Sequence, residues 1–204
     1  MNMIKKGIII LTSTGLSAEP VRRSAVKYFD TLPLKSVVII TTAAEGKENN
    51  KYSKLAETQF KELNFSIINF VDIEINPQAD FSKYNVMFVC GGNTFKLMKF
   101  ARQVNFDKDI KSLLERGGVY IGVSAGSLIV GPSIQIANEI HPDKNDVSLV
   151  DFNGFNIVNF IIFPHYSSNL EEEIKSFEKR NNAKIERIDN SQAIIIEDGK
   201  KTLI

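Results

Sequence analysis

The sequence is poor in the residues that build disulfide frameworks and metal clusters. Of its 204 residues, one is cysteine, Cys90, and two are histidines, His141 and His165. A single cysteine excludes an internal disulfide framework and a multi-cysteine metal site. Because disulfides are typical of oxidising compartments, we expect a cytoplasmic protein.

Charge of one sign and long apolar runs are also scarce. The chain carries 25 Lys and Arg against 24 Asp and Glu, a net charge of +1, without a dense basic run. This balance argues against a nucleic-acid surface. The apolar run at 7–11 is far too short for a membrane span or a signal-peptide core, so we expect no membrane partner. Length and a 43% apolar fraction predict one globular domain over 1–204.

Short apolar segments alternate with segments of helical spacing. Ser17 is expected to cap the first helix, with Pro20 in its first turn, and Asn169 with Glu172 resembles a capping box that opens the last helix. The apolar runs are continuous, as in strands covered on both faces. We therefore predict an α/β fold with a mostly parallel sheet between two helical layers, and a ligand site beyond the carboxyl ends of the strands. Expected strands are 7–11, 36–41, 65–70, 86–90, 119–123, 157–163 and 193–196; expected helices are 18–29, 52–63, 94–101 and 106–114.

The most informative stretch is Gly122-Val-Ser124-Ala-Gly126, directly after an apolar run. A serine between two such glycines is typical of a nucleophile elbow, a sharp turn from a buried strand into a helix. The glycines are expected because a Cβ at either position would collide with a neighbouring strand or helix. The pattern predicts a strained, exposed serine at the sheet's carboxyl edge.

A serine nucleophile needs a general base, and the chain offers two histidines. His165 follows the apolar run 161–163 and Pro164, which places it at a strand's carboxyl end, the same edge as Ser124. His141 lies in a polar stretch that indicates an exposed loop. We therefore predict His165 as the base and give His141 no role.

The reaction also needs donors aimed at the developing oxyanion. The N–H of Ala125, just after the serine, is the natural first donor. A second is expected from the glycine pair in Gly91-Gly92-Asn93-Thr94, where a strand ends and a helix begins. The loop 12–15, after the first strand, is a further candidate for lining the substrate site.

Spacing alone does not choose the acid that would orient His165. Glu139, Asp151 and Asp189 all remain open, because triad members meet in space and not in sequence.

Three motifs together resemble peptidase family S51, which includes dipeptidase E and the more distant cyanophycinases. They are Cys90-Gly-Gly-Asn-Thr-Phe-Lys-Leu97, Tyr120-Ile-Gly-Val-Ser-Ala-Gly-Ser127 and Phe163-Pro-His-Tyr166. The resemblance implies a three-layer, flavodoxin-like architecture related to class I glutamine amidotransferases. It also implies Ser124 as nucleophile, His165 as base, and Gly92 with Ala125 as the oxyanion hole.

Two patterns within the family place the acid differently, and the chain departs from the family at two further positions, Gln135 and Cys90. One pattern matches Glu139, which we take as the prediction. The other aligns a glutamate with Asn190, beside Asp189, which is the alternative. Gln135 stands where dipeptidase E has an arginine. Cys90 replaces the first of the family's three glycines, and its strand end is expected to raise the thiol pKa and keep it inert.

The predicted function is a serine-type peptidase that acts on short peptides through an acyl-enzyme, with dipeptides carrying an N-terminal acidic residue as the expected substrates. Substrate contacts are expected from Gly91, Asn93, Thr94 and Gln135. No metal or organic cofactor is required, and we expect a monomer or homodimer. Two alternatives stay open: a cyanophycinase-like hydrolase of β-aspartyl, isopeptide or other amide bonds, and a non-catalytic binding protein on the same scaffold.

Overall fold

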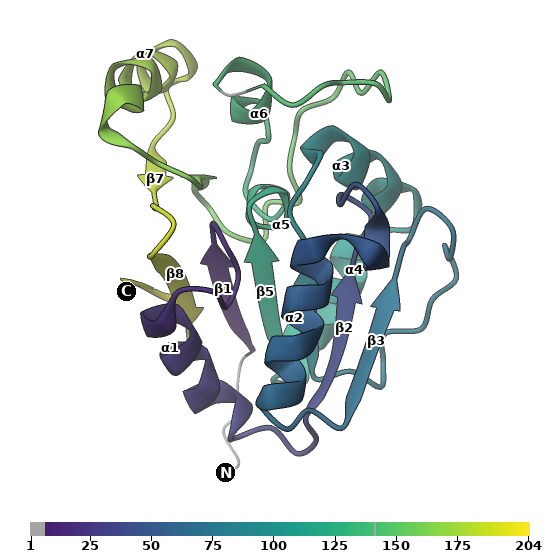
Figure 1. The fold of residues 1–204 in the computed structure, drawn as a ribbon. Coiled ribbons are helices and arrows are strands. Elements are labelled where there is room, and N and C mark those ends of the chain that lie inside the picture. Colours follow the sequence, from purple (N-terminus) through teal and green to yellow (C-terminus); the bar gives the residue numbers. More distant parts are fainter. Residues whose placement is uncertain (1–6, 141) are drawn as a thin grey trace.

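A mixed seven-stranded sheet forms the centre of the molecule (Figure 1). The structure is a computed structural model, and it describes residues 7–140 and 142–204. The strand order is β3-β2-β4-β5-β1-β8-β9, in which the first five strands are mutually parallel and β8 runs antiparallel to β1. The predicted mostly parallel α/β sheet is therefore confirmed. The strands are β1 (Ile8–Thr12), β2 (Ser36–Ile40), β3 (Ile67–Val71), β4 (Val86–Val89), β5 (Val119–Val123), β8 (Ala193–Glu197) and β9 (Lys200–Leu203).

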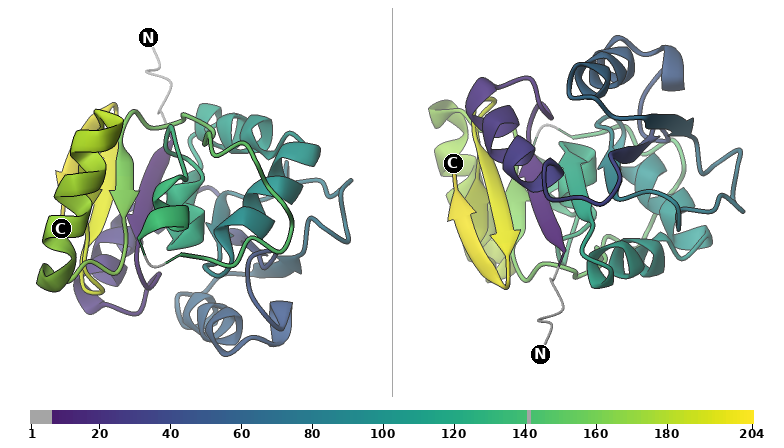
Figure 2. Two further views of the ribbon diagram at one scale, coloured as in Figure 1. Left: turned by 90° about the horizontal axis from the view of Figure 1, so that it is seen from above. Right: turned by 90° about the horizontal axis from the view of Figure 1, so that it is seen from below.

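Helices cover both faces of this sheet, as Figure 2 shows from above and below. Successive strand residues point to opposite faces, so each strand feeds two cores. In β1, Ile8 and Ile10 pack with buried residues of α1 and α2, whereas Ile9 and Leu11 pack with those of α3 and α4. The helices are α1 (Glu19–Phe29), α2 (Lys51–Glu62), α3 (Thr94–Gln103), α4 (Phe106–Glu115), α5 (Ala125–Leu128), α6 (Ile136–Glu139) and α7 (Glu171–Asn181).

A second, two-stranded sheet stands beyond the carboxyl edge of the first. It consists of β6 (Ile161–Phe163) and β7 (Ile185–Arg187), which run parallel, with α7 connecting them. The expected strand 157–163 is thus shorter than predicted, and β7 was not predicted at all. Its sequence, Ile185-Glu-Arg187, has one apolar residue followed by two charged ones, so the segment shows no strand alternation.

Two predicted helix caps are wrong. Ala18, not Ser17, occupies the N-cap of α1, and it makes no side-chain cap bond, although Pro20 does lie in the first turn. Asn169 lies inside a short 3₁₀ turn, Ser168–Leu170, and Leu170 precedes α7 instead. In both cases the chain enters the helix without a side-chain acceptor, so packing of Val21 and Ile174 into the cores fixes these helices.

The strand directions bring several loops to one edge. Because β1, β4 and β5 are parallel, the loops that follow them meet at their carboxyl ends. Strand β8 runs the other way, so the loop that precedes it arrives at the same edge. No helix in the described part of the chain is long and apolar enough to cross a membrane.

Candidate active site

Ser124 sits at a strained turn between β5 and α5. Its φ and ψ are 49° and −107°, a conformation that L-residues rarely adopt. A Cβ built on Gly122 would lie 2.6 Å from the carbonyl oxygen of Gly126, and one on Gly126 would lie 2.4 Å from that of Val89. Both glycines are therefore required by close backbone approach, and the predicted elbow is confirmed in its geometry.

Buried hydrogen bonds hold this turn from three sides. The N–H of Ser124 donates to the carbonyl of Thr12 at 2.9 Å. The hydroxyl of Ser127 lies 2.9 Å from the Thr12 carbonyl and 2.8 Å from that of Gly122. The hydroxyl of Tyr120 donates to the Gly126 carbonyl at 2.7 Å, and complete burial raises the pKa of this phenol far above its usual range. The elbow is thus a rigid part of the core.

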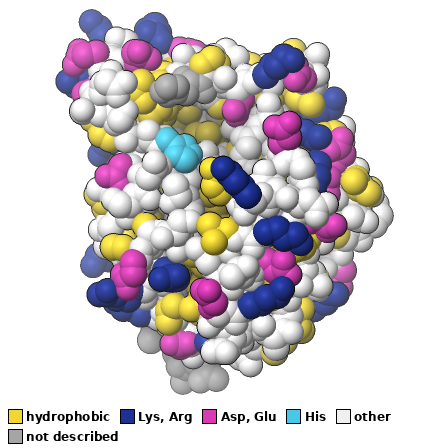
Figure 3. Space-filling view, viewed as in Figure 1, with side chains coloured by type: hydrophobic (Ala, Val, Ile, Leu, Met, Phe, Trp, Pro, Cys, Tyr) yellow, Lys and Arg dark blue, Asp and Glu magenta, His cyan; other side chains and the backbone are white. Residues whose placement is uncertain are grey.

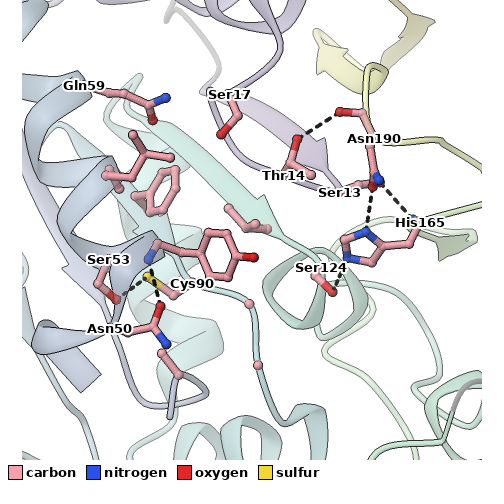
Figure 4. Close-up of a pocket in the computed structure, with 18 of the residues that line it drawn as sticks. Ser13, Thr14, Ser17, Asn50, Ser53, Gln59, Cys90, Ser124, His165 and Asn190 are labelled. Carbon is pink, nitrogen blue, oxygen red and sulfur yellow. Dashed lines mark hydrogen bonds between the residues drawn. The ribbon is translucent and has the colours of Figure 1, made fainter. Parts of the chain in front are cut away.

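His165 lies just after β6, in the second sheet's carboxyl-end loop, and faces Ser124. Its Nε2 lies 3.1 Å from Ser124 Oγ, and its Nδ1 lies 2.7 Å from Asn190 Oδ1 (Figure 4). Its ring is exposed; Figure 3 shows it in cyan at the surface, next to a hollow. The predicted Ser124–His165 pair is therefore brought within hydrogen-bond distance, and the structure places Asn190 at the other ring nitrogen of His165.

The parallel pairing of β6 with β7 explains why His165 and Asn190 meet. Phe163 pairs with Arg187, so the residues that follow both strands leave side by side. The N–H of Ile188 donates to the Phe163 carbonyl at 3.1 Å and continues the ladder. His165 follows two residues after β6 and Asn190 three residues after β7.

Two hydroxyls of the loop after β1 fix these segments to the main sheet. Ser13 Oγ accepts from the N–H of His165 at 2.9 Å and donates to the Asp189 carbonyl at 2.8 Å. Thr14 Oγ1 donates to the Asn190 carbonyl at 2.9 Å. This loop was expected to line the substrate site; it does line a cavity there, and it also holds the His165–Asn190 pair in place.

The contact with Asn190 selects one form of the imidazole. An amide oxygen accepts only, so the neutral ring of His165 donates from Nδ1 and has its acceptor nitrogen, Nε2, facing the serine hydroxyl. The ring is thus in the tautomer that a general base needs. Asn190 carries no charge, so it orients the ring without the electrostatic support that a carboxylate gives to an imidazolium.

Neither acid expected from the sequence reaches His165. The carboxylate of Glu139 binds Gln135 Nε2 and Arg180 Nη2, each at 2.7 Å. Asp189 turns toward its own loop, where the Ser191 hydroxyl and N–H lower the pKa of its carboxyl. The predicted Glu139, and Asp189 as its alternative, are therefore replaced at Nδ1 by Asn190, because β7 and not α6 runs beside β6. Asp151, also left open, binds Arg102, and His141 lies outside the described residues.

Two free N–H groups lie where the oxyanion hole was predicted. Ala125 is the first residue of α5 and follows Ser124, and Gly92 follows β4. Among the described residues, neither N–H has a hydrogen-bond acceptor. Gly92 has φ of 133°, and a Cβ there would lie 2.1 Å from the Ala43 carbonyl oxygen, so only glycine fits. Gly92 also lines both of the cavities that Ser124 lines.

Two cavities meet at Ser124, His165 and Gly92. The larger one, of about 750 Å³, lies between the loop after β1 and helix α2; hydroxyl and amide side chains line part of it, among them Thr14, Ser17, Asn50, Ser53 and Gln59. The smaller one, of about 260 Å³, lies between α5, α6 and the end of β6; apolar side chains form most of its wall, namely Leu128, Ile136, Ala137, Ile140 and Phe163. The reactive groups therefore stand on the border between a large and a small compartment.

The other residues expected to contact substrate have mixed positions. Gly91 lines the large cavity and Thr94 the small one. Asn93 caps α3, accepting from the N–H of Lys96 at 2.8 Å. Gln135 is held by Glu139 and lines neither cavity. Cys90 lines the large cavity, but burial raises the pKa of its thiol to about 11, as expected.

The fold has three layers, with a mostly parallel sheet between two layers of helices, and a strained serine faces a histidine at the carboxyl edge of that sheet. These features define a class of α/β proteins with a serine elbow. Within that class the chain belongs to peptidase family S51, whose family model matches residues 8–204. The resemblance seen in the three motifs is thereby confirmed.

Known relatives share this assignment at modest identity. An uncharacterised peptidase of Listeria monocytogenes is 29% identical over 176 residues, covering 83% of this chain and 85% of the relative. Peptidase E of a Nostoc species is 27% identical over 168 residues, covering 81% of this chain and 67% of that protein. The crystal structure of a candidate peptidase E from Listeria monocytogenes EGD-e superposes with a TM-score of 0.78 at 25% identity, over 98% of both chains.

Proposed function

We propose that this protein is a serine peptidase that cleaves short peptides through an acyl-enzyme. The observation that carries the proposal is the Ser124 Oγ to His165 Nε2 distance of 3.1 Å at a strained elbow, with unpartnered N–H groups of Gly92 and Ala125 beside it. Membership of a peptidase family supports the same reaction.

In the proposed mechanism His165 Nε2 takes the proton of Ser124 as Oγ attacks the scissile carbonyl carbon. The carbonyl oxygen becomes negatively charged and binds the N–H groups of Gly92 and Ala125. His165 then gives the proton to the leaving amine, and the C–N bond breaks. Water, deprotonated by the same nitrogen, attacks the ester and regenerates Ser124. Asn190 holds the ring in the required tautomer throughout.

The size of the site favours short substrates. The small cavity is below the volume of about 300–1,000 Å³ typical of ligand pockets, and buried apolar side chains form most of its lining. A cavity of this size suits a single substrate residue on that side of the scissile bond. This supports an exopeptidase, with the rest of the peptide in the larger cavity.

The expected preference for an N-terminal acidic residue stays a prediction from the family resemblance. A carboxylate side chain would need a cationic partner, and no Lys or Arg of the described residues lines either cavity. The alternative of a β-aspartyl or isopeptide hydrolase also stays open. It too concerns an acidic substrate, so the lining of the two cavities does not distinguish it from the predicted preference.

The test is hydrolysis of a peptide panel by the wild type and by Ser124→Ala. The panel contains Leu-Ala, Ala-Ala, Asp-Ala, Glu-Ala and β-Asp-Ala dipeptides. We expect release of the first residue by the wild type and a loss of at least about 10³-fold in kcat in the variant. Turnover that survives Ser124→Ala would refute the serine mechanism. Tight binding of panel members without turnover would favour the binding-protein alternative.

A further inference from the structure

The small cavity contains one carboxylate that the proposed mechanism does not use. Asp143 lines it together with Ser124, His165, Gly92 and Thr94. The side chain is half-buried, and its Oδ2 accepts from the N–H of Thr94 at 2.7 Å. Among the described residues it has no ion-pair partner. It is thus a charged group in a mostly apolar compartment, and a cation there would be strongly favoured.

The loop that carries Asp143 is fixed to the turn that carries the oxyanion donor. Thr94, which Asp143 binds, follows Gly92 by two residues. Asn93 Nδ2 contacts the carbonyl of Lys144, and the N–H of Asp143 donates to the carbonyl of Ala137 at 2.9 Å. The carboxylate therefore keeps a set position relative to the Gly92 N–H.

The chemistry of a peptide N-terminus matches this arrangement. In a peptide cleaved after its first residue, the free ammonium is attached to the carbon next to the scissile carbonyl. When the carbonyl oxygen lies at the Gly92 N–H, the ammonium lies only a few bonds from that oxygen. It lies toward Asp143 if the small cavity holds the first residue, and away from Asp143 if the large cavity holds it. The large cavity also contains a carboxylate, that of the exposed Glu45, whereas in the small cavity Asp143 is half-buried and is hydrogen-bonded through Thr94 to the turn that carries the Gly92 N–H.

We infer that the small cavity binds the first residue of the substrate, that Asp143 binds its ammonium, and that the apolar wall binds an uncharged side chain. This inference rests on the proposed peptidase function. It makes Asp143 the residue that restricts the enzyme to free N-termini. It also disfavours an acidic first residue, because its carboxylate would meet a like charge and apolar walls.

Asp143→Asn is the informative variant. The amide oxygen still accepts from Thr94, so the loop keeps its anchor while the charge is lost. Asp146→Asn is the matched control, because Asp146 belongs to the same loop, is exposed, pairs with Lys144 and lines neither cavity. Melting temperatures of both variants establish that the fold is kept.

The kinetic readout is kcat/KM for Leu-Ala and for N-acetyl-Leu-Ala. We expect Asp143→Asn to lower kcat/KM for the free dipeptide about 10- to 100-fold, mainly through KM, and to leave the acetylated peptide unchanged. Asp146→Asn is expected to match the wild type. Two results would overturn the inference. One is an equal effect of Asp143→Asn on both peptides; the other is a loss of the preference for the free amine in Glu45→Gln, which changes the large cavity, and not in Asp143→Asn. Faster cleavage of Asp-Ala than of Leu-Ala by the wild type would overturn the assignment of an uncharged side chain.

A binding measurement separates this inference from the proposed function. Titration calorimetry of Ser124→Ala with leucine amide and N-acetyl-leucine amide needs no turnover. We expect the amide with a free ammonium to bind more tightly, and Asp143→Asn in the same background to remove that difference. If Asp143→Asn removes this difference in affinity but the wild type cleaves no peptide, the ammonium site is retained and the peptidase function is rejected. A difference that persists in the double variant would reject the site even if peptides are cleaved.

Discussion

Ser124 and His165 belong to two regions that are held in different ways. The turn at Ser124 is formed by its own neighbours in sequence, namely the flanking glycines, Tyr120 and Ser127, and the adjacent strand β1 adds one further partner, the Thr12 carbonyl. His165 is fixed by segments far away in sequence, through the hydroxyl of Ser13 and the side chain of Asn190. The serine is therefore a local feature of the chain and the base a tertiary one. Mutations should affect the two regions differently.

Apart from the loss of the proposed nucleophile itself, the largest effect is expected where the second region supports the proposed base. Asn190→Ala removes the acceptor at Nδ1, and the ring loses its preferred tautomer and orientation. We expect kcat to fall by about 10²-fold with little change in KM. Steady-state kinetics on the best dipeptide of the panel measures this. Glu139→Gln and Asp189→Asn are matched controls, because both carboxylates lie in the region without contacting His165. A fall of similar size in Glu139→Gln would return the role to that acid.

Asn190→Asp sharpens the same comparison. A carboxylate at this position would favour the protonated imidazole, so the ring would lose its proton-accepting form at a higher pH than in the wild type. The acidic limb of the profile of kcat/KM against pH therefore shifts to higher pH. The sign follows because the base works only when it is unprotonated. A limb that does not move would mean that residue 190 does not contact the titrating ring.

The contrast between the two regions also explains what the sequence could predict. The elbow, the glycine pair and His165 lie next to continuous apolar strands, so periodicity and turn chemistry located them. Asn190 depends on the pairing of β6 with β7, and β7 has no alternating pattern. Glu139 was the better positional match in sequence, yet α6 turns it toward Arg180. Which polar residue reaches a ring nitrogen is decided by tertiary pairing, which spacing does not record.

A smaller effect is expected from the ion pairs that attach α7 to β7. Arg187 bonds Glu171 and Glu178, each at 2.9 Å, and the bond from Arg187 lowers the pKa of Glu178. Arg187→Met should lower the free energy of unfolding at pH 7 by about 1 kcal/mol, a fall of about 2–4 °C in Tm. Because the pKa of Glu178 is lower in the folded protein, its ion pair stabilises the fold fully above the ordinary glutamate pKa and less at lower pH. The difference between variant and wild type should therefore shrink as pH falls below about 4.

Lys175→Met on the same helix is the control for Arg187→Met, because Lys175 makes only exposed ion pairs with Glu171 and Glu172. Its Tm is expected to equal that of the wild type at every pH. Thermal melts followed by circular dichroism between pH 3 and 8 measure both variants. If Arg187→Met also lowers kcat while Lys175→Met does not, the position of β7 controls the His165–Asn190 pair.

The smallest effect is expected at Cys90, in the rigid region beside the elbow. Burial raises the pKa of its thiol to about 11, so only about one thiol in a thousand is ionised at pH 8. Iodoacetamide should therefore react slowly at pH 8 and markedly faster as pH rises toward that pKa, and Cys90→Ala should keep the wild-type kcat. Rapid alkylation at pH 8 would mean that this strand end opens to solvent. It would then show that the Ser124 region is less rigid than its hydrogen bonds indicate, and the contrast with the His165 region would fail.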